Sequence, residues 1–220
     1  MKAWRTALIA LLCAALALAL GAAMLALPEH AVRLPGQVAA NLGESGVAHP
    51  VTAVLLNFRG YDTLLEVAVL LLALLGVFAL SHHATSHAHP TTPGHPVLQT
   101  LARLLAPLMV LVSGYLLWIG AHAPGGAFQA GAVLAAAGVL LRLAGLLPAW
   151  AQPGRMLRGG VALGLVIFLA VAVAGLPQGA LLHYPPAIAS ALILLVEAGL
   201  TLSIGLTLAG LYLASAGWRQ

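Results

Sequence analysis

Long apolar stretches constrain the fold of this 220-residue chain more than any other feature. A run of about 18 or more apolar residues has the length of a helix that crosses the hydrocarbon core of a bilayer. Such runs occupy Thr6–Leu27, Thr63–Leu80, Leu101–Ile119, Phe128–Pro148, Gly159–Leu176 and Ala187–Ser215. Only 6% of the residues are charged, against roughly 25% in soluble domains. The sequence therefore predicts an all-α, polytopic transmembrane protein with about six transmembrane helices.

The first apolar run has two interpretations, a retained helix or a cleaved signal peptide, because Lys2 and Arg5 precede it. Its apolar core, from Ala7 to Leu27, exceeds the roughly 7–15 residues of a signal-peptide core, which favours a retained helix. Cys13 is the single cysteine of the chain. The sequence therefore excludes an intrachain disulfide and a zinc site built on several thiolates.

Basic residues divide unevenly between the two sides of the membrane. With the N-terminus inside, only Arg33 and Arg59 fall outside. The inner side then holds the remaining basic residues, Lys2, Arg5, Arg103, Arg142, Arg155, Arg158 and Arg219. The positive-inside rule thus predicts cytoplasmic N- and C-termini in a multi-pass membrane protein. The net charge of +4 reflects this topology. Nucleic-acid binding is not expected, because the chain has no basic helix.

The chain divides at residues 81–96, a tract of His, Ser, Thr, Pro and Gly. Before it, two spans flank a long external segment at about residues 28–62, and after it four spans follow with short connections. Five of the nine histidines lie in the tract, four of them within residues 81–90 and the fifth at His95. Such a tract can bind Zn, Ni or Cu. It lacks fixed ligand spacing and carboxylates, however, so we interpret it as a flexible linker and predict no metal site.

Residues 120–131 read Gly-Ala-His-Ala-Pro-Gly-Gly-Ala-Phe-Gln-Ala-Gly, a polar bend between two apolar stretches. At membrane depth its backbone must find partners in protein or in a wet cavity. The helix is broken by Pro124, Gly125 and Gly126. It is expected to restart with Phe128, Gln129 and Gly131. The glycines are expected to shape a re-entrant bend, since no P-loop lysine follows them. His122 either relays protons or only forms a hydrogen bond beside the turn.

Two glutamates lie inside apolar spans. Glu66 lies one helical turn beyond Asp62, on the same face. Glu197 lies about ten residues into the last span, near the middle of the bilayer, with Thr201 one turn further. A carboxylate within a span is costly and usually faces protein or water. Glu66 is therefore a candidate proton or Na+ carrier, with a structural buried hydrogen bond as the alternative. Glu197 is a candidate for an ion path or a subunit contact.

A second string carries a polar cluster at the start of the second span. It reads Val51-Thr-Ala-Val-Leu-Leu-Asn-Phe-Arg-Gly-Tyr-Asp-Thr-Leu-Leu-Glu66. Arg59 and Asp62 are three residues apart and can pair once the helix begins, and Asp62 can also cap that helix. Gly60 permits a turn, and Tyr61 can anchor the interface. The cluster is either an interfacial clamp or the entry of an ion path.

Both strings resemble known families. Residues 120–131 closely resemble the signature of the MnhB/MrpB family, the B subunit of multisubunit Na+/H+ antiporters, which usually reads Gly-His-x-x-Pro-Gly-Gly-Gly-Phe-Gln. B subunits also have an acidic residue before Gly-Leu-Thr-Leu, where this chain has Glu197. Residues 51–66 resemble the MbhE-like segment of the large A subunit of Mrp antiporters and of membrane-bound hydrogenases. Here Asn57 replaces an Asp of that pattern, which removes a titrating group.

The resemblance implies three parts: an MbhE-like two-helix membrane segment (1–80), the linker (81–96) and an MnhB/MrpB-like four-helix domain (97–220). It further implies a non-catalytic subunit of an Mrp-type Na+/proton antiporter, contributing to assembly and to the cation path. Its partners would be other membrane subunits, the transported Na+ and H+, and the lipid bilayer, with no cofactor. One alternative is a membrane-arm subunit of a hydrogenase or another complex I-like oxidoreductase. A self-contained metal carrier using the His82–His95 tract is a third interpretation. No catalytic constellation predicts an enzyme.

Overall fold

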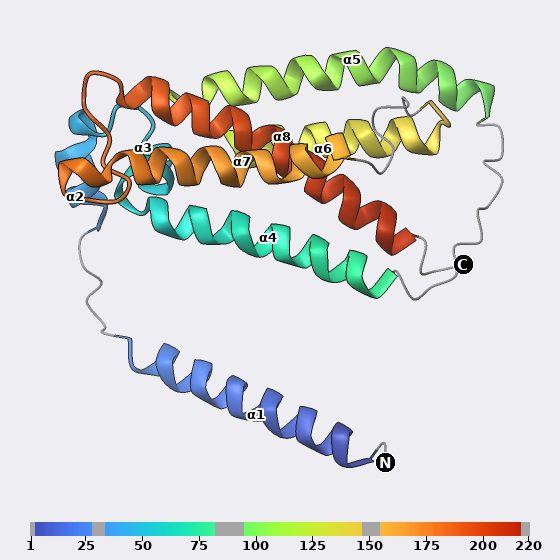
Figure 1. Cartoon of the computed structure of the whole chain (residues 1–220), viewed down its shortest axis with the longest axis horizontal. Coiled ribbons are helices and arrows are strands. Elements are labelled where there is room, and N and C mark those ends of the chain that lie inside the picture. The colour runs from blue at the N-terminus through green and yellow to red at the C-terminus, as the bar shows by residue number, and fades with distance from the viewer. Residues whose placement is uncertain (1–2, 28–33, 82–94, 147–154, 217–220) are drawn as a thin grey trace. The chain divides into compact units, whose positions relative to one another are not determined.

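The structure is a computed structural model that describes residues 3–27, 34–81, 95–146 and 155–216 (Figure 1). All regular elements in these ranges are helices, which confirms the all-α prediction. The chain divides into two compact units, Met1–Gln37 and Val38–Gln220. The first unit is built on α1 (Ala3–Leu25), a 23-residue helix whose segment Thr6–Leu25 is apolar enough to cross a membrane.

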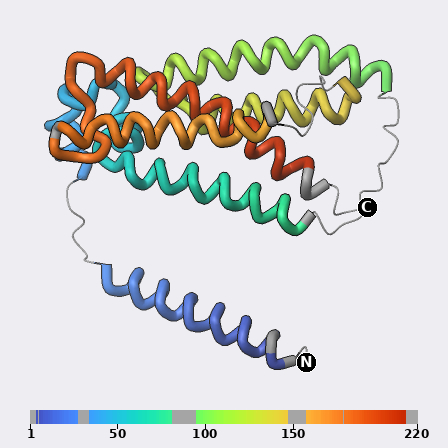
Figure 2. Tube along the Cα trace, viewed as in Figure 1, coloured from blue at the N-terminus to red at the C-terminus, as the bar shows by residue number. Residues whose placement is uncertain are grey.

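The second unit is a bundle of five helices: α4 (Gly60–Ser81), α5 (Pro96–Ile119), α6 (Ala127–Leu143), α7 (Arg155–Ala174) and α8 (Ala189–Ala216). Helix α8 packs against α4, α6 and α7, which run alongside it in Figure 2, and touches α5 more lightly. Buried residues make up 56% of the apolar core of α8, against 17% to 22% for α4, α5 and α7. Helix α8 is therefore the centre of the bundle.

Small residues bring the helices close to α8. A Cβ added at Gly164 of α7 would lie 2.8 Å from the carbonyl oxygen of Gly199. A Cβ added at Gly131 of α6 would lie 2.9 Å from Ile204 Cγ2. Close backbone approach of this kind is how helices associate where the surrounding lipid is as apolar as the side chains. The register of α6 and α7 against α8 is thus set at glycines.

The sequence predicted about six spans. The described residues contain five helices that are long and apolar enough to cross a membrane, together with the shorter apolar helix α6. Helix α6 ends at Leu143, before the predicted end of this span at about Pro148, which lies outside the described residues. Gly145 has φ +68°, its N–H bonds to the carbonyl of Arg142, and the N–H of Leu146 bonds to the carbonyl of Leu141. These bonds form the Schellman motif, which closes the last turn of a helix.

The predicted external segment contains several short helices. They are α2 (Leu34–Asn41), the 3₁₀ turn η1 (Leu42–Glu44), α3 (Pro50–Ala53) and the π-helical η2 (Val54–Phe58). Within the second unit, α3 lies at the same end of the bundle as the connection between α7 and α8 (Figure 1). That connection contains a 3₁₀ turn, η4 (Leu176–Gln178). Both segments fold against the bundle end, and α3 covers the bend between α5 and α6.

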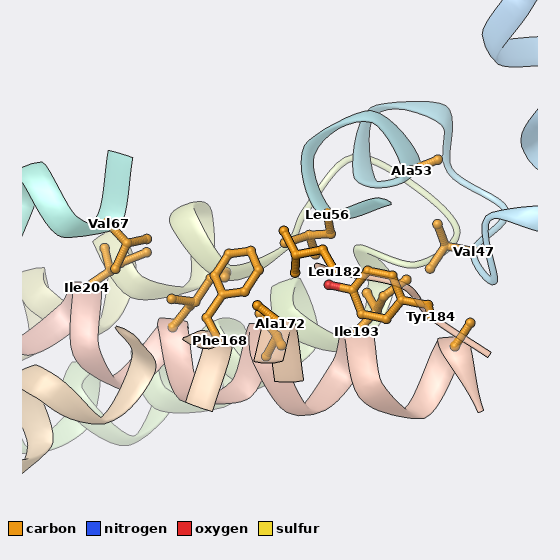
Figure 3. Packing of buried hydrophobic residues seen from close by; sticks show 14 residues of the cluster. Val47, Ala53, Leu56, Val67, Phe168, Ala172, Leu182, Tyr184, Ile193 and Ile204 are labelled. Atoms are coloured by element: carbon orange, nitrogen blue, oxygen red, sulfur yellow. The ribbon is translucent and has the colours of Figure 1, made fainter. Parts of the chain in front are cut away.

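An apolar cluster beneath these segments joins the bundle end to its middle (Figure 3). Phe168 of α7 and Ile193 of α8 are almost fully buried in it, and Leu56 of η2 packs on the same cluster. Tyr184, between α7 and α8, is buried there too, and its hydroxyl has no hydrogen-bond partner among the described residues. Burial raises the pKa of Tyr184 to about 12, so this phenol stays protonated at physiological pH.

Candidate functional site

The bend between α5 and α6 folds back onto the end of α5. The N–H groups of His122 and Ala123 both donate to the carbonyl of Ile119, and the N–H of Gly126 donates to the carbonyl of Leu116 at 2.8 Å. These bonds give the interrupted backbone the internal partners that it needs at membrane depth. The predicted bend is therefore a compact turn rather than an open loop.

Two glycines of the bend have no room for a side chain. Gly126 has φ +102° and ψ −174°, a backbone conformation that is essentially restricted to glycine. A Cβ at Gly125 would lie 2.5 Å from the carbonyl oxygen of Leu116. The Pro-Gly-Gly string is thus explained by backbone geometry. Gly131 has a different role, because it lies inside α6 and packs against Ile204 of α8.

The segment before α4 closes over this bend. The N–H groups of Ala48 and His49 both donate to the carbonyl of Ala121 at 2.9 Å. The hydroxyl of Thr52 donates to the carbonyl of Gly120 at 2.5 Å and is buried. These bonds satisfy carbonyls that the end of α5 leaves without helical partners. Residues 48–52 and the bend therefore form one structural unit.

Glu197 of α8 reaches the first turn of α6. It is 3% exposed, and the backbone N–H of Ala127 donates to its carboxylate. A Cβ at Gly126 would lie only 2.8 Å from Glu197 Oε1, so the missing side chain lets the carboxylate approach. A helix N-terminus carries partial positive charge and unsatisfied N–H groups, and both favour an anion there. The N-terminus of helix α6 thus partly compensates the negative charge of Glu197.

A cavity of about 40 Å³ lies beside this carboxylate. Glu197, Gln129 and the hydroxyl-bearing Thr52 and Thr63 contribute polar groups to its lining. A water molecule needs roughly 10–15 Å³ of such volume and several polar partners, so the cavity can hold water. The hydroxyl of Thr63 donates to the carbonyl of Leu55 at 2.6 Å, which ties α4 to the π-helical turn before it. Single π-helical turns are frequent at functional sites.

The other predicted ion-path residues lie elsewhere. Glu66 is exposed on α4 and does not line the cavity. Asp62 pairs with Arg59, as predicted from their spacing, and both side chains are largely exposed. The hydroxyl of Thr201 donates to the backbone carbonyl of Glu197 at 2.8 Å. His122 is exposed and lines a separate, open cavity of about 460 Å³.

The remaining motif residues surround the site. The hydroxyl of Tyr61 donates to the carbonyl of Leu181 at 3.1 Å, and a Cβ at Gly60 would lie 3.2 Å from Leu182 Cδ1. Both contacts hold the start of α4 against the connection between α7 and α8. In the first turn of α6, Phe128 is half-buried and Gln129 is exposed, and Pro124 in the bend is also exposed.

Sequence reasoning did not identify Thr52 and Thr63 as parts of the site. Their hydroxyls bond carbonyls in other elements, and nothing in their local sequence reveals those partners. Among the residues that the structure describes, no group of three or more His, Cys, Asp and Glu side chains could hold a metal ion. Most of the His-rich tract lies outside the described residues.

These features define an all-helical, polytopic membrane protein with a buried carboxylate at an interrupted pair of helices. Residues 97–214 match the family described as a domain related to the MnhB subunit of Na+/H+ antiporters. The match covers more than half of the chain, and the protein belongs to this family. The resemblance of residues 120–131 to MnhB/MrpB is therefore confirmed.

Two solved structures are similar to the chain. One is a chain of the Mrp complex from Dietzia sp. DQ12-45-1b, with 26% identity and a TM-score of 0.66. The match covers 96% of this protein and 26% of that longer chain. The other is a chain of the membrane-bound sulfane sulfur reductase, an archaeal respiratory membrane complex, with 28% identity, a TM-score of 0.71 and 98% coverage of both chains. No curated protein matches the sequence.

Proposed function

We propose that this protein is a non-catalytic subunit of an Mrp-type Na+/proton antiporter, and that Glu197 lies on the cation path of the assembled complex. Family membership and the similar chain of an Mrp complex support the first part. The observation that carries the second part is the burial of Glu197 at the interrupted junction of α5 and α6, beside a cavity large enough for water. The proposal includes an inner-membrane location in bacteria with both termini in the cytoplasm.

The geometry of Glu197 suits reversible binding of a small cation or proton. An ionised carboxylate has about four acceptor positions, and the N–H of Ala127 occupies one of them. The other positions remain available to a proton, a water molecule or Na+. Helix ends that line a cavity inside the membrane are a recurrent place for coupling-ion sites in transporters. The cavity beside Glu197 gives a hydrated ion room to approach the carboxylate.

The test compares transport by complete complexes that carry Glu197→Gln or Glu197→Asp. Glutamine can still accept the N–H of Ala127 but cannot titrate, so we expect normal complex levels and loss of Na+-dependent proton movement in proteoliposomes. Aspartate should retain part of the activity. Glu44→Gln is the matched control, because Glu44 is an exposed carboxylate outside the spans. Wild-type exchange by Glu197→Gln, at wild-type complex levels, would refute a role in the path.

A second candidate function has its own support. The chain of the sulfane sulfur reductase matches this protein over 98% of both lengths, whereas the Mrp chain is much longer. This protein would then be a membrane-arm subunit of a respiratory oxidoreductase. Purification of the complex through a tag on this chain separates the two functions. Co-purifying subunits with iron–sulfur absorbance would favour the oxidoreductase, and antiporter subunits without such absorbance would favour the Mrp-type complex.

A further inference from the structure

Glu66 lies on an exposed face of α4 that the rest of the second unit does not cover. This face, called here the Glu66 face, consists of Glu66, Val69, Ala73, Gly76 and Leu80, all of them exposed. The residues follow the three- and four-residue spacing that places side chains along one side of a helix. The opposite side of α4 carries Val67 and Leu74, which are buried in the bundle. The Glu66 face therefore points out of the bundle.

Lipid is a poor cover for this face. Glu66 lies in the second turn of α4, and no ion pair or hydrogen bond of its side chain occurs among the described residues. A charged side chain in a span costs several kcal/mol unless it meets protein or water. The nearest cation on the same helix end, Arg59, is already paired with Asp62. The charge of Glu66 thus has no partner among the described residues of the second unit.

The shape of the face suits a helix. A Cβ added at Gly76 would meet nothing within 4 Å, and Ala73 lies one turn before it, so the backbone of α4 is accessible there. Further around the helix the exposed residues are bulky, among them Leu72 and Leu75. Small residues beside larger ones form the shallow groove into which a second transmembrane helix packs. Ala73 and Gly76 lie on the same side of α4 as the carboxylate.

We propose that the Glu66 face binds a transmembrane helix of another subunit, and that this helix carries a Lys or Arg at the level of Glu66. The inference deepens the proposed function, because it rests on the protein acting as a subunit of a larger membrane complex. Charge complementarity selects the partner residue, and the small residues Ala73 and Gly76, about two and three turns further, favour close helix packing. The match covers only 26% of the similar Mrp chain, so that chain has further segments beyond this fold.

The experiment places a photoreactive amino acid at Ala73 or at Ala79 in the complete complex. Both alanines are exposed on α4, but they lie about 120° apart around the helix. We expect crosslinks from position 73 to a transmembrane segment of another subunit that contains Lys or Arg, and crosslinks from position 79 to lipid. Crosslinks to lipid from both positions, to a second copy of this chain, or to a segment without a basic residue would overturn the proposal.

A charge exchange tests the ion pair itself. Glu66→Lys should reduce the level of intact complex at least several-fold, and replacing the basic residue of the crosslinked segment by Glu should restore it. Ala73→Leu should also lower complex levels, while Ala79→Leu should not. No restoration by the exchange, or equal effects of the two Leu variants, would contradict the docking. Crosslinking does not require transport, so a complex that fails the Na+/H+ exchange test can still show docking at the Glu66 face. The failure of one proposal can therefore be distinguished from the failure of the other.

Discussion

Replacing Gly126 by alanine tests the geometry of the candidate site most directly. The residue has φ +102° and ψ −174°, and holding a non-glycine residue in such a conformation costs about 1–3 kcal/mol. The new Cβ would also lie 2.8 Å from Glu197 Oε1, so the carboxylate must move from the first turn of α6. We expect Gly126→Ala to lower the free energy of unfolding by at least the cost of holding alanine in this backbone conformation.

Gly138→Ala is the matched control in the same helix. Its Cβ would lie 3.8 Å from the Cβ of Ala209, an ordinary contact, and its backbone is helical. Alanine in a helix interior is more stable than glycine by roughly 0.5–1 kcal/mol. The two variants should therefore differ by about 1.5–4 kcal/mol, in opposite directions from the wild type. Equilibrium unfolding of the purified chain in mixed detergent micelles measures this difference.

A double-mutant cycle separates the strain of the backbone from the clash with the carboxylate. Glu197→Ala removes Oε1, so Gly126→Ala should cost less in that background, with a coupling energy of about 0.5–3 kcal/mol for residues in contact. The conformational cost should remain. If Gly126→Ala is as harmless as Gly138→Ala, the bend does not need glycine at this position, and the described contact between α8 and α6 is wrong.

Further predictions concern the segment over the bend, the isolated subunit and the linker. Thr52→Val should destabilise the chain by about 1–3 kcal/mol in the same unfolding assay, because the carbonyl of Gly120 loses a buried donor, whereas Thr100→Val should have little effect because its hydroxyl bond is exposed. The purified chain alone should show no Na+-dependent proton movement in proteoliposomes, and robust exchange by it would contradict the subunit proposal. Deletion of Ser86–Gly94 should leave complex levels and Na+ tolerance of cells nearly unchanged, and loss of tolerance would assign the linker a function.

The sequence predicted the helices well because long apolar runs have few alternatives. It placed the end of α5 at Ile119, which is where the structure ends it. It extended α6 too far because the apolar run continues past Gly145, where the chain takes a positive φ and leaves the helix. The external segment was expected only as a connection. Its folding onto Gly120 and Ala121 depends on tertiary hydrogen bonds that leave no periodic pattern.

Glu66 and Glu197 could not be distinguished from the sequence. Each lies in a helix that is apolar on all sides, so hydrophobic periodicity does not reveal which side faces protein. The structure separates them, because one is exposed on α4 and the other is 3% exposed at the first turn of α6. The burial of Glu197 depends on the packing register of α6 on α8, which is set at the contact between Gly131 and Ile204. We accordingly place only Glu197 in the proposed cation path and assign Glu66 to a subunit contact.

The Pro-Gly-Gly bend and the acidic residue of the last span are two sides of one contact. Gly126 has no side chain, so the carboxylate of Glu197 can lie against the backbone and accept the N–H of Ala127. Without the carboxylate, the first turn of α6 would keep a buried donor unsatisfied, and without the glycine the carboxylate could not reach it. A proton or cation that binds Glu197 weakens its attraction to the N-terminus of α6. If Glu197 lies on the proposed cation path, ion binding there would be coupled to the junction of α5 and α6, which Thr52 joins to the segment that leads into α4.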